Sequence, residues 1–177
     1  MRRTQFLHIS SLFRKISILP IVKVRVISIG KTNVPFVKTG IEHYLNRLKH
    51  YVSIEWIELS DVKHASKLDH ASLKKREFDL LKKYLADKGK IILLDEHGKN
   101  YSSVKFAQFI EEQQIQSLQQ LTFFIGGAYG FSSEMLDMKL PRMALSQMTF
   151  THQMIRLLLV EQMYRAFTII KNENYHH

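Results

Sequence analysis

Apolar and polar positions follow two patterns along the chain, and these predict that strands and helices alternate in sequence. Segments in which apolar residues alternate with polar ones, or run briefly unbroken, predict strands at 23–30, 51–59, 90–99, 121–127 and 142–146. Between them, apolar residues recur at every third or fourth position, which predicts helices at 37–48, 72–87, 102–116, 132–138 and from about Thr151 onward. This order predicts an α/β fold in which a mainly parallel sheet is flanked by helices.

The helix predicted at 72–87 carries many positive charges. Its apolar positions are expected to face inward: Leu73, Leu80, Leu81, Tyr84 and Leu85. A solvated face is expected from Lys74, Lys75, Arg76, Lys82 and Lys83. The polar segment before it, 61–70, predicts a loop.

Length and composition indicate one soluble domain. The chain has 177 residues, of which 45% are hydrophobic and 24% charged, and this is enough for a sizeable core. It has no cysteine, which rules out a disulfide framework, a thiolate metal site and a cysteine nucleophile, and fits a cytoplasmic location. No apolar run is long enough to cross a bilayer, so no membrane partner is predicted.

The net charge of +10 bears on the partner of the protein, because a basic surface attracts phosphate backbones. The first 22 residues contribute four Lys or Arg and no acidic residue. The other 22 basic residues outnumber 16 acidic ones and leave +6 on the rest of the chain. RNA is therefore a plausible partner, although many soluble proteins are simply basic.

The first residues, "MRRTQFLHISSLFRKISILPIV", mix basic and apolar side chains without the unbroken apolar centre of a secretory signal. They suit a transit-like segment, an amphipathic arm that binds membranes, or a start assigned too far upstream. We favour the last, because a strand begins directly afterwards. We therefore expect an extension at 1–21 that packs poorly against a domain at 22–177.

Three predicted strands end in segments that fit a ligand site, namely "LLDEHG", "FFIGGAYGF" and "MALSQMTF". Parallel sheets of this class bind ligands beyond the carboxyl ends of their strands. Gly126, Gly127 and Gly130 follow a buried strand, and glycines there let the backbone approach a ligand closely. They match neither the G-x-G-x-x-G nor the P-loop pattern, so a dinucleotide or a triphosphate is not indicated. A simple tight turn is the alternative.

The segment "LSQMTF" interleaves apolar Leu145, Met148 and Phe150 with small polar Ser146 and Thr149. This mixture suits a flat aromatic base together with a thioether. Alternatively, the segment only leads into the terminal helix, with Thr151 as its N-cap.

The terminal helix opens with two polar residues on one face, since His152 and Arg156 are four positions apart. They are either satisfied core or interface residues, or they bind an anion or a carbonyl group. Further along, Glu161 and Arg165 have the spacing of a structural ion pair. The histidines lack a spaced set of partner ligands, so no metal site is predicted.

The segments "FFIGGAYGF" and "ALSQMTFTHQMIRLLLVEQMYRAFTI" and the terminal "NYHH" together resemble the ribosomal large-subunit methyltransferase H family. This is the small bacterial branch of the SPOUT methyltransferase superfamily. The resemblance runs from about residue 22 to the last residue. It implies a SPOUT-type α/β fold with a C-terminal trefoil knot, a homodimer, and S-adenosylmethionine as the cofactor. The implied reaction is methylation of N3 of pseudouridine 1915 in 23S rRNA, on assembled ribosomes.

The resemblance also implies which residues form the site. The cofactor-binding residues that match its motifs are Leu94, Gly126, Leu145, Ser146, Gln147, Met148, Thr149 and Phe150. Those at positions expected to face the target base are His152, Arg156, Tyr175 and His176. Arg156 would stabilise charge on the base, and His152 or His176 would accept the N3 proton, with the tail serving either its own subunit or the partner. Many relatives have proline where this chain has Thr151. A non-catalytic RNA-binding protein of the same fold, and a membrane-associated or organelle-targeted protein, are the alternatives.

Overall fold

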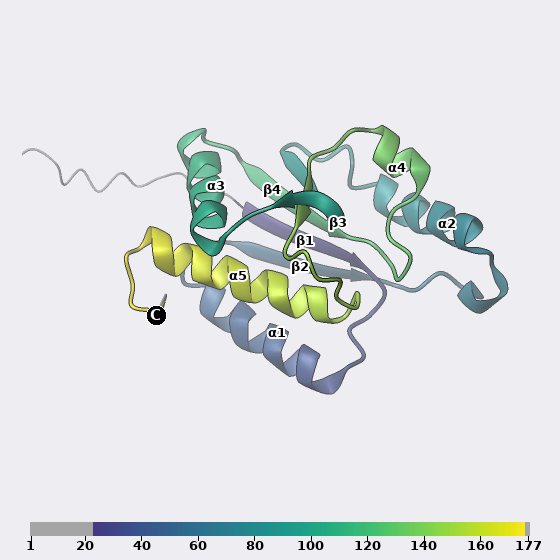
Figure 1. Ribbon diagram of the computed structural model, residues 1–177, viewed down its shortest axis with the longest axis horizontal. Helices are drawn as coiled ribbons and strands as arrows, with labels where there is room; N and C mark the ends of the chain where they lie inside the picture. The colour runs from purple at the N-terminus through teal and green to yellow at the C-terminus, as the bar shows by residue number, and fades with distance from the viewer. Residues whose placement is uncertain (1–22, 176–177) are drawn as a thin grey trace, which may run out of the picture.

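A computed structural model describes residues 23–175, in which five parallel strands form one sheet in the order β2-β1-β4-β3-β5 (Figure 1). The predicted extension at 1–21 and the predicted site residue His176 lie outside the described residues. The elements are β1 (Lys23–Ile29), α1 (Pro35–Leu48), β2 (Ile54–Leu59), a 3-10 turn (Ala65–Lys67), α2 (His70–Lys82), β3 (Lys90–Asn100), α3 (Ser103–Ile115), β4 (Gln120–Ile125), α4 (Ser133–Asp137), β5 (Arg142–Ala144) and α5 (Met154–Ile170).

The predicted order of elements is confirmed, but several boundaries differ from the prediction. β2 begins at Ile54 rather than residue 51, because Tyr51 donates its backbone amide to Leu48 and so belongs to the turn after α1. α2 begins at His70 and ends at Lys82, and its N-cap is Asp69, whose carboxylate accepts from the amide of Ser72 at 2.9 Å.

The start of α5 differs from the prediction by three residues. The helix begins at Met154, although the Thr151 hydroxyl does accept a hydrogen bond from the Met154 amide at 3.2 Å, as a cap would. The ion pair predicted further along is present, with Arg165 Nη2 2.8 Å from Glu161 Oε1. None of the described helices is both long enough and apolar enough to cross a membrane.

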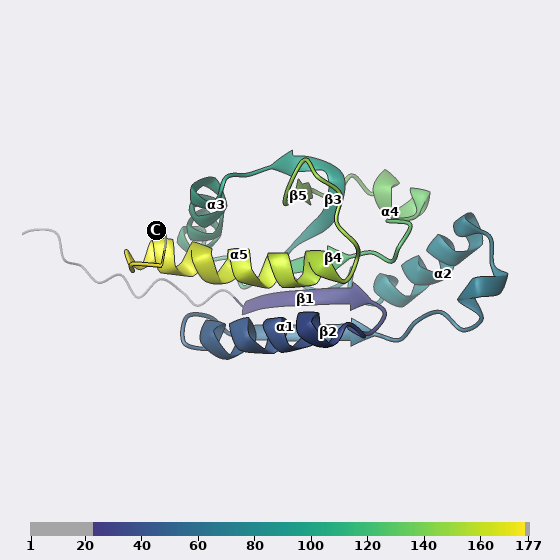
Figure 2. The same ribbon diagram turned by 60° about the horizontal axis from the view of Figure 1, so that its bottom comes forward.

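Different helices cover the two faces of the sheet. Val24 and Val26 of β1 face a core that they share with α1, α3 and α5. Ile27 and Ile29 face the opposite side, where Leu81 of α2 and residues of α4 cover them. In both views the arrowheads of β1 and β2 point toward the end of the molecule where α2 lies (Figures 1 and 2).

β3 pairs with β5 twice, because the strand bends around its short neighbour. Met143 is the register partner of both Leu94 and Lys99, with an irregularity between them. The chain then leaves β5, runs across β3 and turns into α5, which lies beside α1 (Figure 2). The segment 145–153 is thereby held at the carboxyl ends of the strands. The trefoil knot implied by the resemblance stays a prediction.

Candidate active site

A cavity of about 440 Å³ lies at the carboxyl ends of β3, β4 and β5, and the three predicted segments line it. This volume is within the range of pockets that enclose a small organic ligand. Its walls come from Leu94 to His97, from Ile125 to Phe131, and from the segment after β5, with contributions from Lys74, Leu136, His152 and Ile155. The sheet thus brings together three segments that are spread over residues 94–150 of the sequence.

Seven of the eight residues predicted to bind the cofactor line this cavity: Leu94, Gly126, Leu145, Ser146, Met148, Thr149 and Phe150. Gln147 belongs to the same segment but is not among the lining residues. Met148 is 74% exposed, so the segment offers an apolar surface that has no partner within the described chain. The structure therefore brings these predicted residues together at one cavity. Their roles in binding the cofactor stay predictions.

The glycine loop, residues 126–130, forms a tight turn on one wall of the cavity. The amide of Gly130 donates to the carbonyl of Gly127 at 3.2 Å, and Gly130 has a φ of +74°. A side chain at residue 130 would strain this turn, which is why glycine is favoured there. Tyr129 projects from the turn and stacks on His70 of α2, with ring centroids 3.7 Å apart.

Two carboxylates at the rim were not predicted as site residues. Glu96 accepts a hydrogen bond from the Thr149 hydroxyl at 3.0 Å, which ties β3 to the segment after β5. Asp95 accepts from the backbone amide of His97 at 2.8 Å. Their position in "LLDEHG", directly after the buried apolar residues of β3, was the signal that could have identified them.

His152 lies at the cavity wall, next to the start of α5. Burial lowers the pKa of His152 below its usual value, the positive charge of Arg156 acts in the same direction, and Asp61 opposes both. The imidazole is therefore neutral at neutral pH, which is the state in which a histidine can accept a proton.

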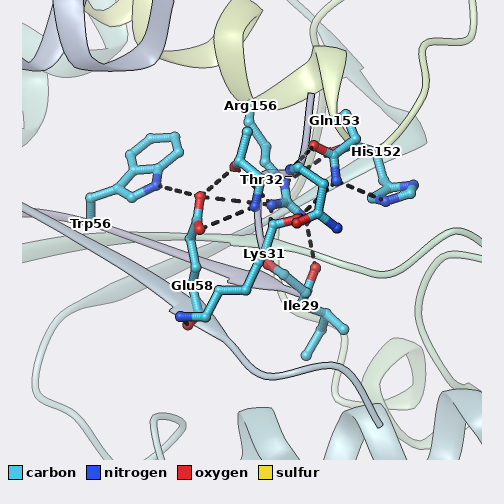
Figure 3. Close-up of polar contacts among 10 residues, drawn as sticks. Ile29, Lys31, Thr32, Trp56, Glu58, His152, Gln153 and Arg156 are labelled. Atoms are coloured by element: carbon cyan, nitrogen blue, oxygen red, sulfur yellow. Dashed lines mark hydrogen bonds and ion pairs between the residues drawn. The ribbon is translucent and has the colours of Figure 1, made fainter. Parts of the chain in front are cut away.

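Arg156 is fully buried, with an exposed fraction of 0%, and it does not line the cavity. Its guanidinium donates to the carbonyls of Ile29 (2.6 Å) and Gly30 (3.1 Å) and to the hydroxyl of Thr32 (3.0 Å). Its Nε donates to the carbonyl of His152 at 3.0 Å (Figure 3). In this conformation Arg156 therefore fixes the start of α5 to the end of β1 and does not present its charge to a ligand.

Glu58 at the end of β2 balances the charge of Arg156, at 3.8 Å (Figure 3). Burial acts to raise the pKa of Glu58, but hydrogen bonds from Thr32 and Trp56 outweigh it and hold the pKa below its usual value. Gln153 adds a second tie, because its side chain donates to the carbonyl of Lys31 at 3.0 Å. The ends of β1, β2 and the start of α5 thus form one polar cluster beneath His152.

Tyr175 lies far from this cluster. Its ring meets Tyr164 with centroids 4.7 Å apart, and its hydroxyl is 3.2 Å from that of Tyr44. Burial and then the contact with Tyr44 raise the pKa of Tyr175 to about 12. Because α5 is 17 residues long, its two ends are about 25 Å apart. The structure therefore does not bring Tyr175 to the cavity of its own subunit.

Glu77 of α2 is a third carboxylate that was not predicted as a site residue. It is 8% exposed and lies against Gly127, on the side of the glycine loop away from the cavity. Burial raises its pKa to about 7. The signal was its position, since it falls within the inward stripe, four residues after Leu73 and four before Leu81.

Comparison with known proteins decides the family. The sequence profile described as "Predicted SPOUT methyltransferase" matches residues 22–176. This chain belongs to the SPOUT methyltransferase family. No group of three or more histidine, aspartate or glutamate side chains suited to a metal occurs among the residues that the structure describes.

Individual relatives of this SPOUT methyltransferase agree with the profile. A protein of Cytophaga hutchinsonii named "Ribosomal RNA large subunit methyltransferase H" is 44% identical over 156 residues, which cover 88% of this chain and 100% of the relative. A protein of the same name from Christiangramia forsetii is 41% identical and covers 87% of this chain and 98% of its own length.

A solved structure supports the fold of this SPOUT methyltransferase. It is described as a probable methylase family protein from Haemophilus influenzae Rd KW20. The TM-score is 0.52 at 11% identity, with 86% of this chain and 69% of that chain covered. At this identity the likeness concerns the fold alone. The predicted resemblance and the predicted α/β fold are confirmed.

Proposed function

We propose that this methyltransferase transfers the methyl group of S-adenosylmethionine to N3 of pseudouridine 1915 in 23S rRNA, on assembled ribosomes in the cytoplasm. The observation that carries the proposal is the cavity at the carboxyl ends of β3, β4 and β5, in a chain whose full-length relatives are named for ribosomal RNA.

The residues of this cavity fit S-adenosylmethionine. Apolar Leu94, Leu145 and Ile155 suit a flat adenine ring, while the glycine loop brings backbone close to the ligand without side chains in the way. Asp95 and Glu96 place negative charge at the rim, where it favours a sulfonium cation. The cofactor supplies an activated methyl group, and the protein therefore has to align it with the base and to remove the N3 proton.

His152 is the residue that we assign to the proton. A methyl transfer to N3 forms an N–C bond, breaks the S–C bond of the cofactor and releases the proton of N3. A neutral imidazole at the cavity wall can take that proton directly or through one water molecule. Deprotonated N3 is the stronger nucleophile, so removing the proton promotes the transfer.

We propose that Arg156 acts on the removal of the N3 proton through His152. A direct contact with the base would require Arg156 to give up four hydrogen bonds in a fully buried site. Its Nε–H instead holds the His152 carbonyl, and its charge helps to keep the imidazole neutral. Arg156 is therefore a positioning residue.

The RNA partner is supported by charge. Four of the five basic residues predicted on α2 are exposed, namely Lys75, Arg76, Lys82 and Lys83, whereas Lys74 lines the cavity. A solvated basic face next to the pocket attracts the phosphate backbone without reading sequence.

A homodimer completes this proposal. Tyr175 lies about one helix length from the cavity of its own subunit, so a role at the base requires the tail to reach the site of a partner subunit. In a symmetric dimer each subunit would then supply the tail for the other.

The proposal is tested by incubating the protein and labelled S-adenosylmethionine with ribosomes, large subunits or naked 23S rRNA that lack the modification. We expect label in 23S rRNA of the ribosome. Gly126→Val is the matched variant, because a side chain at Gly126 would enter the cavity wall and press on Gly130, 3.2 Å away. Binding of RNA without any binding of the cofactor or transfer of label would favour the non-catalytic alternative.

A further inference from the structure

The glycine loop is supported from behind by α2. Glu77 and His70 are seven residues apart and therefore lie on the same side of the helix. Glu77 contacts Gly127, and the His70 ring stacks on Tyr129. The loop that forms one wall of the cavity is thus held between α2 and the space where the ligand binds.

The contact between Glu77 and Gly127 leaves no room for a side chain. The backbone amide of Gly127 donates to the carboxylate of Glu77. A Cβ built on Gly127 would overlap that carboxylate, and its three nearest atoms all belong to Glu77. Gly127 has no positive φ, so the close approach of the carboxylate, rather than the backbone conformation, accounts for a glycine at this position.

A second, small cavity of about 10 Å³ lies on the same side of the loop as Glu77. It is lined by Glu77, Phe78, Leu81, Gly126, Gly130 and Phe131, among others. Its volume is that of about one water molecule. The glycine loop is therefore a thin wall between two spaces, and the Glu77 side chain lies on the side behind it.

We propose that Glu77 is a positioning residue of the active site: its carboxylate holds the amide of Gly127 from behind and so sets the shape of the glycine loop against which the cofactor binds. This inference rests on the proposed function, since it concerns the affinity of the same cavity for S-adenosylmethionine.

The energetics of Glu77 support a role beyond stability. Burial raises its pKa to about 7, Asp61 in the loop after β2 acts in the same direction, and the Gly127 amide and Lys74 oppose them. A carboxylate in such surroundings costs stability at neutral pH, and an uncharged or apolar residue would be the more stable choice. Residues that cost stability in this way gather at functional sites.

The first test is a double-mutant cycle on the affinity for S-adenosylmethionine, measured by calorimetry with the full chain. We expect Glu77→Ala to weaken binding about tenfold, as for the loss of a hydrogen bond to a charged group. Gly127→Ala should weaken it by at least as much, because its Cβ displaces the carboxylate. In the Glu77→Ala background, however, Gly127→Ala should cost less than about twofold, because the space is then free.

The second test measures the affinity for S-adenosylmethionine as a function of pH. A merely structural role of Glu77 would not produce a pH dependence of this affinity. The ionised carboxylate is the stronger acceptor for the Gly127 amide, so the affinity of the unaltered protein should rise as pH passes upward through about 7. Glu77→Gln should keep the fold and lose this rise. Asp79→Asn, which removes one negative charge from the exposed side of the same helix, is the matched control and should keep it.

The outcomes separate the two proposals. If the unaltered protein binds no cofactor, the proposed function is wrong and this inference with it. If it binds, but the effects of Glu77→Ala and Gly127→Ala are additive, or Glu77→Gln and Asp79→Asn give the same pH profile, then Glu77 does not position the loop and only this inference is overturned.

Discussion

The guanidinium of Arg156 and the backbone carbonyl of Ile29 are 2.6 Å apart, and this contact attaches the start of α5 to the end of β1. The two residues are 127 positions apart in sequence. The segment 145–153, which lines the cavity, is therefore anchored at its end by a buried charge that also balances Glu58.

Replacing Arg156 should destabilise the whole protein. Arg156→Ala would leave Glu58 without its ion-pair partner and three backbone carbonyls without their donor, and breaking a buried ion pair costs about 3–5 kcal/mol. Urea unfolding followed by circular dichroism measures this loss. Arg76→Ala, on the exposed face of α2, is the control and should change stability by about 0.5 kcal/mol at most. Equal stability of the two variants would show that the Arg156 cluster is not what holds α5.

The pH dependence of methyl transfer should follow His152. Its pKa lies below the usual value, so the neutral base is present at neutral pH, and the rate should fall only as pH drops through the pKa and the imidazole gains a proton. His152→Asn should lower the single-turnover rate by about 10²–10⁴ and remove this acidic limb. A variant that is slower but keeps the same acidic limb would assign the proton to another group.

The position of Tyr175 predicts the result of mixing two inactive subunits. If the tail serves the partner, a dimer of one His152→Asn subunit and one Tyr175→Ala subunit contains one intact site. Random mixing of the two variants should then recover roughly a quarter of the full activity. If the tail serves its own subunit, every site carries one defect and no activity returns.

Stability should depend on the ionisation of Glu77, with a sign that can be derived. The folded protein keeps the Glu77 proton up to about pH 7, whereas the unfolded chain loses it near its ordinary pKa of 4.5. The free energy of unfolding therefore falls as pH rises from about 4.5 to about 7. Glu77→Gln should remove this loss and be more stable than the unaltered protein at pH 8, by as much as about 3 kcal/mol. Thermal unfolding at pH 4.5 and pH 8 tests this, with Asp79→Asn as the control, and equal stability of Glu77→Gln and the unaltered protein at pH 8 would contradict it.

Much of the fold could be predicted because its signals are local. The strands of this parallel sheet are short apolar runs, and the glycines after β4 and the mixed segment after β5 stand out against them. Ligands bind at the carboxyl ends of such strands, and this rule alone predicted that the three segments would lie at one site. The start of α2 was harder to predict, because Asp69, which caps the helix, and Ser72 are both residue types that favour a helix start.

The chemistry of single side chains could not be predicted in the same way, because it depends on contacts distant in sequence. Nothing local to Arg156 shows that the carbonyls of Ile29 and Gly30 lie opposite it. Glu77 reads as one more charge on a charged helix until its contact with Gly127 is seen. In both cases the sequence showed a charged residue on an inward face of a helix, but it did not show which groups that residue contacts.

The most direct test of the central claim is the mass of the nucleoside at position 1915 of 23S rRNA, measured after ribosomes that lack the modification are incubated with the protein and S-adenosylmethionine. We predict a gain of one methyl group on N3 of that pseudouridine, and no gain with Gly126→Val. An unchanged nucleoside, despite cofactor bound in the cavity, or a methyl group at another position, would contradict the proposed function.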